Sequence, residues 1–172
     1  MKDDDILISN SGSVYNIKVK GRANFEYAVP LRHFANCMSS GIELIRIEAS
    51  ECTFMDSTFM GVLAMIGMKA KTFRATIEIH CMEPPVRALL KGLGVDRLFT
   101  FCDAAGGITV ESWNNVLPQK KSALTTAETV SEAHKTLVQA DESNAAKFDA
   151  VIKFADADIE NLKKNHIDNG SF

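Results

Sequence analysis

The chain has 172 residues, of which 46% are hydrophobic and 24% charged, and its formal net charge is −3. This balance is typical of one globular domain, or of a small domain with an appendage, and lacks the basic stripe of a nucleic-acid-binding protein. No apolar run reaches the roughly 18 residues that span a bilayer. The acidic N-terminal segment has no apolar signal-peptide core, so we expect a cytoplasmic protein without direct membrane insertion.

The first part of the chain predicts two strands, a helix and a third strand. Residues 6–9 form a short apolar run, apolar and polar residues alternate over 14–20, and Gly21 is expected to end the second strand. Apolar residues then recur at helical spacing over 27–40. Alternation returns over 42–49, which predicts a strand that leads into the next helix.

The next part predicts helices that alternate with strands. A helix is expected over 57–73, a strand over 75–82, a helix that begins at Pro84, and a last strand over 98–102. The order ββαβαβαβ over residues 5–103 predicts an α/β fold with a mixed β-sheet and helices packed on it.

The composition changes after residue 104. We expect an α/β domain over 1–104, a linker over 105–122 and a C-terminal helical extension over 123–172. A break near 141–144 predicts a helix hairpin there, with one long bent helix as the alternative. An apolar stripe on the second helix needs cover from the α/β domain, from the partner helix or from a second subunit. Its members are Phe148, Ile152, Ala155, Ile159 and Leu162. We expect intramolecular packing first, with a homodimer through these helices as the open alternative.

The four cysteines, Cys37, Cys52, Cys81 and Cys102, are widely spaced and form no C-x-x-C pair. No histidine stands at zinc-ligand spacing beside them. We therefore expect reduced and mostly buried thiols, with no metal site and no cofactor.

The segment Asp56-Ser57-Thr58 places a carboxylate and two hydroxyls where a strand gives way to an apolar helix. One interpretation is that Asp56 or Ser57 only caps the helix. The other is that Ser57 accepts a phosphate, whose charge of about −1.5 to −2 is favoured by the helix dipole but opposed by Asp56. The added charge would then act on a partner docked over Met55, Phe59 and the start of the helix.

Phe54-Met55-Asp56-Ser57-Thr58, followed by Met60-Gly61-Val62-Leu63, is similar to the hallmark of the STAS (sulfate transporter and anti-sigma factor antagonist) domain family. The resemblance covers about residues 5–103. It implies an anti-sigma factor antagonist that binds an anti-sigma factor with Ser kinase activity while Ser57 is unphosphorylated, and that a Ser phosphatase resets. Thr58 is the second candidate for phosphorylation.

The resemblance also implies a set of partner-binding residues, namely Asn24, Met55, Asp56, Thr58 and Phe59. Two of them depart from the family pattern. Phe59 stands where the family usually has Gly, and Asn24 where many members have Asp. The alternative function is a non-switching structural subunit of a larger signalling or lipid-transport assembly.

An enzyme is not expected. Ser57, Asp56 and His80 could be imagined as a hydrolase triad, but the sequence around Ser57 has no nucleophile-elbow pattern and His80 falls on a predicted strand. The glycines form neither a dinucleotide-binding motif nor a P-loop. We therefore predict no catalytic residue.

Overall fold

The computed structural model describes residues 4–103, 108, 110, 112–115 and 122–168. The strands are β1 (Asp5–Ser11), β2 (Val14–Ala23), β3 (Leu44–Met55), β4 (Thr76–His80), β5 (Thr100–Cys102) and β6 (Asn114–Asn115). The α-helices are α1 (Phe25–Cys37), α2 (Ser57–Thr72), α3 (Pro84–Gly92), α4 (Ala123–Ala140) and α5 (Ala145–Asp168). A 3-10 turn, η1 (Asp96–Leu98), lies between α3 and β5, and another, η2 (Glu142–Asn144), lies between α4 and α5.

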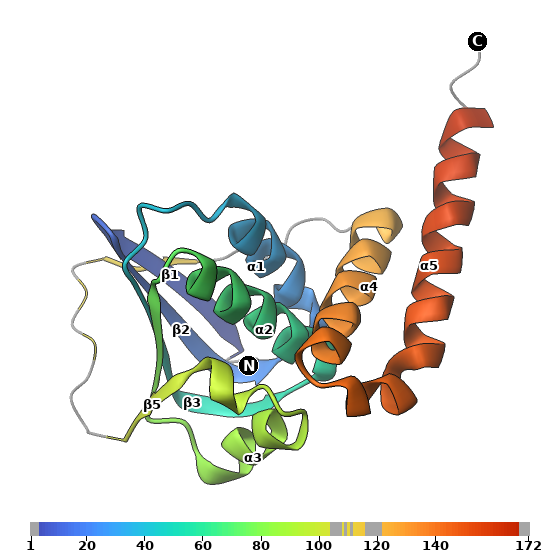
Figure 1. Ribbon diagram of the computed structural model, residues 1–172. Coiled ribbons are helices and arrows are strands. Elements are labelled where there is room, and N and C mark those ends of the chain that lie inside the picture. The colour runs from blue at the N-terminus through green and yellow to red at the C-terminus, as the bar shows by residue number, and fades with distance from the viewer. Residues whose placement is uncertain (1–3, 104–107, 109, 111, 116–121, 169–172) are drawn as a thin grey trace.

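The strands form one mixed sheet in the order β5-β4-β3-β2-β1-β6. β2, β3, β4 and β5 run parallel, whereas β1 is antiparallel to both β2 and β6. Parallel neighbours need crossover connections, and α1, α2 and α3 provide them. Helices α1 and α2 lie side by side on one face of the sheet (Figure 1). The predicted α/β fold with a mixed sheet is confirmed.

β2 and β3 are both longer than the sequence pattern predicted. β2 passes through Gly21, which was expected to end it, and β3 continues to Met55. The two strands stay paired because two irregularities shift their register, one between Lys18 and Lys20 and one at Gly21. Gly21 has a φ of +66° and lies inside β2, beside the second irregularity, in which β3 carries the extra residue. The extended pair brings Ala23 opposite Met55, where α1 and α2 both begin.

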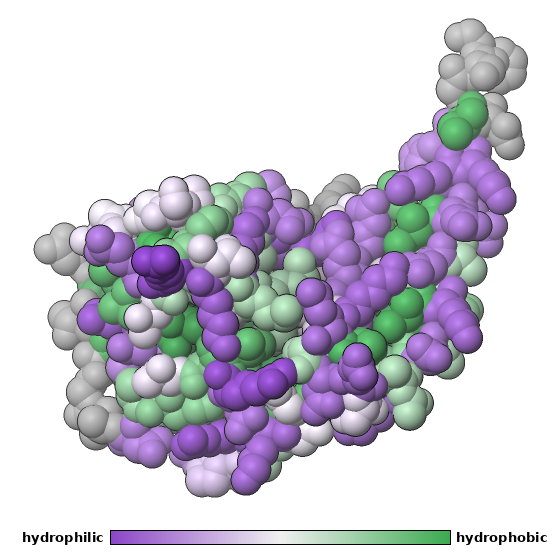
Figure 2. Space-filling view, in the orientation of Figure 1, coloured by the Kyte–Doolittle hydropathy of each residue, from purple (hydrophilic) through white to green (hydrophobic). Residues whose placement is uncertain are grey.

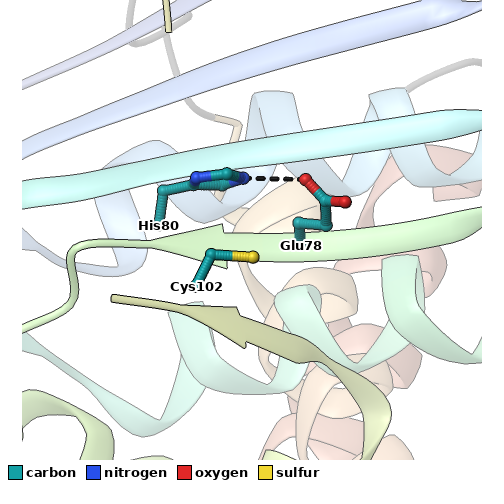
Figure 3. A group of neighbouring side chains, drawn as sticks. All are labelled: Glu78, His80 and Cys102. Carbon is teal, nitrogen blue, oxygen red and sulfur yellow. Dashed lines mark hydrogen bonds and ion pairs between the residues drawn. The ribbon is translucent and has the colours of Figure 1, made fainter. Parts of the chain in front are cut away.

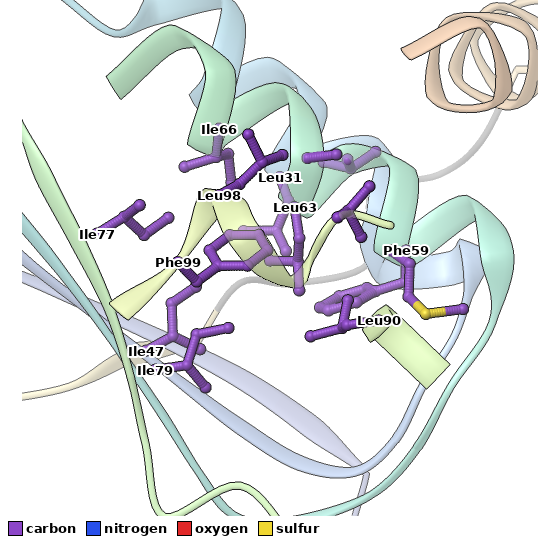
Figure 4. Close-up of a cluster of buried hydrophobic side chains, with 14 of the residues drawn as sticks. Leu31, Ile47, Phe59, Leu63, Ile66, Ile77, Ile79, Leu90, Leu98 and Phe99 are labelled. Atoms are coloured by element: carbon purple, nitrogen blue, oxygen red, sulfur yellow. The ribbon is translucent and has the colours of Figure 1, made fainter. Parts of the chain in front are cut away.

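The core lies between the sheet and the helices (Figure 4). Ile47 and Ile79 point from the sheet toward this layer and are fully buried, as are Leu63 and Phe59 of α2. Along each strand the side chains alternate between the two faces of the sheet. Glu78 and His80 of β4 therefore lie on the face opposite to the buried Ile77 and Ile79.

The C-terminal helices form a second layer. α4 packs against α2, and α5 packs against α4 and extends beyond it (Figure 1). In the stripe predicted to need cover, Ala155 is buried and the other four residues are half-buried. An apolar groove of about 710 Å³ follows the seam between α4 and α5 (Figure 2), and Phe154 beside it is 72% exposed.

The residues between the sheet and α4 are described only in part. Strand β6 falls inside the segment 105–122 that was expected to be a linker. The rest of that expectation rests mainly on residues outside the described part. Among the helices that the structure describes, none is both long enough and apolar enough to cross a membrane.

Candidate functional site

The Asp56 carboxylate joins the beginnings of two helices. One of its oxygens accepts a hydrogen bond from the Phe59 backbone N–H at 2.8 Å, which caps α2. Its other oxygen accepts from the Phe25 N–H, the first residue of α1, at 2.7 Å. Asn24 caps α1 itself, since its side-chain oxygen accepts from the Glu26 N–H at 2.9 Å. Two positive dipole ends therefore converge at one carboxylate, which already compensates them in part.

Ser57 is the first residue of α2 and is half-buried. Its Oγ lies 2.9 Å from Nε2 of His134, a residue of α4 that is 77 positions further along the chain. Nδ1 of His134 lies 2.7 Å from the Val130 carbonyl oxygen, which can only accept, so Nδ1 carries the proton. In a neutral ring Nε2 is then the acceptor, and the Ser57 hydroxyl donates to it.

His134 is 3% exposed and packs edge-on against Phe148 of α5, with ring centroids 4.8 Å apart. Burial lowers the pKa of His134 below its ordinary value, and this outweighs the Val130 carbonyl and the Asp56 carboxylate, which raise it. The ring is therefore neutral at neutral pH. The phosphoacceptor candidate is thus tied to a buried, uncharged imidazole.

Two further contacts hold α4 over the start of α2. A methyl group built on Gly61 would lie 2.5 Å from the Ala133 carbonyl oxygen, so the two helix backbones touch directly. On the α1 side, Arg32 donates two hydrogen bonds of 2.8 Å to the carboxylate of Glu132. The Glu132 hydrogen bond raises the pKa of Arg32, and the same pairing lowers the pKa of Glu132.

The structure corrects the predicted docking face. Met55 and Phe59 are 1% and 0% exposed, because the end of β3 and the inner side of α2 face the core. They cannot present an apolar surface to a partner in this conformation. Thr58, the second phosphorylation candidate, is also buried at 7% exposure. Among the predicted partner-binding residues, Asn24 and Asp56 are half-buried and serve as helix caps.

His80 is not part of this site. It lies 2.8 Å from a Glu78 oxygen on β4, whereas Ser57 pairs with His134. The triad that Ser57, Asp56 and His80 could have formed is therefore not assembled. A serine hydroxyl on an imidazole Nε2 is also half of an acyl-transfer site, but here a backbone carbonyl orients the ring and α4 and α5 bury it.

Sequence reasoning missed His134, although α2 carried a signal. Ten residues of this helix are buried, and they surround it: Thr58, Phe59, Met60, Gly61, Val62, Leu63, Ala64, Ile66, Gly67 and Ala70. A helix that is apolar all round is covered on both sides. The small residues Gly61 and Ala64 indicate where another backbone approaches closely. The sequence does not say which segment supplies that backbone.

Comparison with known proteins assigns a family to the part of the chain that contains Asp56 and Ser57. The family model described as Mlab, STAS domain, matches residues 6–100, which is more than half of the chain. The chain belongs to the STAS domain family. A search of curated proteins found no match.

Among solved structures, the chain resembles one described as the anti-sigma factor antagonist SpoIIAA in its unphosphorylated form, with a TM-score of 0.51 and 13% identity. The match covers 57% of this chain and 88% of SpoIIAA. At this identity the likeness establishes a shared fold. The family match ends at residue 100, so α4 and α5 lie beyond the part of this STAS protein that the family model describes.

Proposed function

We propose that this STAS protein is a phosphorylation-switched regulator of the anti-sigma factor antagonist type, acting in the cytoplasm. Its partner is an anti-sigma factor with Ser kinase activity, which binds while Ser57 is unphosphorylated, and a Ser phosphatase resets the switch. The observation that carries the proposal is the position of Ser57 where two helices begin, with its hydroxyl hydrogen-bonded to His134 at 2.9 Å.

The hairpin of α4 and α5 gives the switch an intramolecular component. His134 holds the Ser57 hydroxyl in a hydrogen bond, so we expect the partner to bind a state in which α4 has moved away. The apparent dissociation constant of such a partner is the intrinsic constant divided by the fraction of open protein. The hairpin is therefore a competitor for the same surface, and its stability sets the partner's affinity.

Phosphorylation of Ser57 disrupts the docked hairpin. A phosphorylated Oγ has no hydrogen to donate to Nε2 of His134, so the 2.9 Å hydrogen bond is lost. Because the backbones of Gly61 and Ala133 already touch, α4 cannot move closer to α2 to compensate. The phosphorylated form therefore exposes the start of α2, with a phosphate charge of about −1.5 to −2 beside Asp56 that weakens the docking of the partner.

The test uses partner capture from source-cell lysate and hydrogen exchange of the purified full chain. The baits are wild type, Ser57→Ala and Ser57→Asp. We expect wild type and Ser57→Ala to recover a kinase-type ATPase, and Ser57→Asp to lose it while its α4 amides exchange faster. Equal recovery of one complex by all three baits, with unchanged α4 exchange, contradicts the switch.

A second candidate is the non-switching subunit of a larger signalling or lipid-transport assembly. The half-buried position of Ser57 and its bond to a buried histidine favour it, because these are also the properties of a serine that only joins two helices. In that case the equal-recovery result above is the expected one.

A further inference from the structure

Three side chains that can ligate a metal converge on the polar face of the sheet. Glu78 and His80 are two residues apart on β4 and so point to the same side. Cys102 of β5 is the register partner of His80 in the parallel pair. One ligand atom from each, a carboxylate oxygen, an imidazole nitrogen and the sulfur, all lie within 4.8 Å of one another (Figure 3).

We propose that Glu78, His80 and Cys102 form a binding site for one Zn²⁺ ion. The spacing fits the ion, because zinc bonds of about 2.0–2.3 Å in a tetrahedron hold ligand atoms roughly 3.3–3.6 Å apart. The separations are compatible with that range, since His80 Nε2 lies 2.8 Å from a Glu78 oxygen and all three ligand atoms lie within 4.8 Å of one another. Small side-chain rotations therefore suffice.

The chemistry of the three ligands favours zinc over calcium or magnesium. A thiolate and an imidazole are ligands for borderline-soft ions, whereas calcium and magnesium prefer oxygen atoms alone. A thiolate and a carboxylate carry two negative charges, so the site with Zn²⁺ is electrically neutral. Three protein ligands leave the fourth position of the tetrahedron open to water.

The surroundings permit binding. The side chains of His80 and Glu78 are 16% and 25% exposed, so an ion can enter yet is largely shielded. Arg46 forms a salt bridge with one of the proposed ligands, because its Nε lies 3.7 Å from the Glu78 carboxylate. Its side chain is 41% exposed, so it can turn toward solvent when the ion takes its place.

Sequence spacing could not reveal this site, and the expectation of no metal site rested on spacing alone. His80 and Cys102 are 22 positions apart, and only the parallel pairing of β4 with β5 makes them neighbours. The expectation of mostly buried thiols was wrong. Cys52 is buried, but Cys81 and Cys102 are half-buried and Cys37 is exposed.

The test is a Zn²⁺ titration of the reduced full chain in competition with a chromophoric chelator. We expect one equivalent to bind, and Co²⁺ in its place to give a thiolate-to-metal charge-transfer band. Cys102→Ser and His80→Asn should each weaken binding at least about 100-fold, since even outer-shell changes cost 10–100-fold. Thermal unfolding without metal checks that each variant is folded.

Cys37→Ser is the matched control. The Cys37 sulfur lies 3.6 Å from His33 Nε2 on α1, which makes a second Cys–His pair in the same protein. Wild-type affinity in Cys37→Ser together with loss in Cys102→Ser supports the proposal. Loss in Cys37→Ser, retention in Cys102→Ser, or no binding at micromolar protein and metal overturns it. Ser57 has no part in this test, so its outcome is independent of the proposed switch.

Discussion

Gly61→Ala isolates the contact that holds the hairpin on the STAS domain. The new methyl group would lie 2.5 Å from the Ala133 carbonyl oxygen and 2.7 Å from both its carbonyl carbon and its Cβ. Two of these atoms belong to the backbone of α4, so no side-chain rotation relieves the clash. α4 must move away from α2 for the substitution to be accommodated.

The magnitude follows from what differs between the docked and undocked states. Alanine improves the helix propensity of α2 by about 0.8–1.0 kcal/mol, but this gain is present in both states and cancels. The overpacking cost of about 1–3 kcal/mol applies only when α4 is docked. The docking equilibrium should therefore shift roughly 5- to 150-fold toward the open state.

Hydrogen–deuterium exchange read by peptide mass spectrometry measures this shift. The amides of α4 should exchange faster by that factor, while those of β3 and β4 stay protected. Gly92→Ala is the matched control, because a methyl group there meets no atom within 4 Å. The reasoning fails if Gly61→Ala leaves α4 protection at the wild-type level, or if Gly92→Ala lowers it equally.

Three other changes probe the packing of the hairpin, two by the same exchange measurement and one by urea unfolding. Burial lowers the pKa of His134 below its ordinary 6.5, so on acidification the ring takes up a proton in the open state before it does so in the docked state. Docking is therefore strongest above about pH 6.5 and weakens as the pH falls below it, by at most about 1.4 kcal/mol per pH unit. His134→Gln should remove this dependence, and an equally steep dependence in that variant would refute the assignment. Glu132→Gln weakens a half-buried bidentate pair with Arg32, and we expect α4 to exchange faster after a loss of about 1–2 kcal/mol. This loss is smaller than that of a fully buried pair because solvent screens the two charges. Unchanged exchange would show that the pair contributes nothing to docking. Asn144 is fully buried and donates hydrogen bonds to the carbonyl oxygens of Leu93 and Leu137. Asn144→Ala should therefore lower the free energy of unfolding, measured by urea denaturation, by about 2–4 kcal/mol. A loss below about 1 kcal/mol would contradict this.

Most elements of the STAS domain could be predicted from the sequence, because apolar residues recur at every second position in strands and at every third or fourth in helices. Alternating residues such as Ile45 and Ile47 indicated a strand, and Pro84 indicated the start of a helix. The end of β2 was missed because a glycine with positive φ, such as Gly21, is expected in a turn but here lies inside a strand beside a register shift. Local patterns identify elements, whereas the register between two strands depends on both of them.

The site was predictable only up to its local part. Asp56 as the cap of α2 follows from the residue type and its place before an apolar helix. The side of α2 on which Phe59 lies, and the bond from Ser57 to His134, depend on how α4 packs 77 residues later. Met55 and Phe59 were expected to form a docking face but are buried, because large apolar residues beside a helix start are more often part of the core.

The charges around Ser57 decide how the hairpin responds to a phosphate. One response would keep α4 in place, with a protonated His134 paired to the phosphate. That arrangement needs a proton on a ring that burial keeps neutral, and it places the phosphate beside Asp56 with little water. It also requires α4 to shift away from Ser57, which disturbs the close packing of Ala133 on Gly61 that stabilises the docked state. Full departure of α4 hydrates the phosphate and ends its crowding with Asp56, so release of the hairpin is the favoured response.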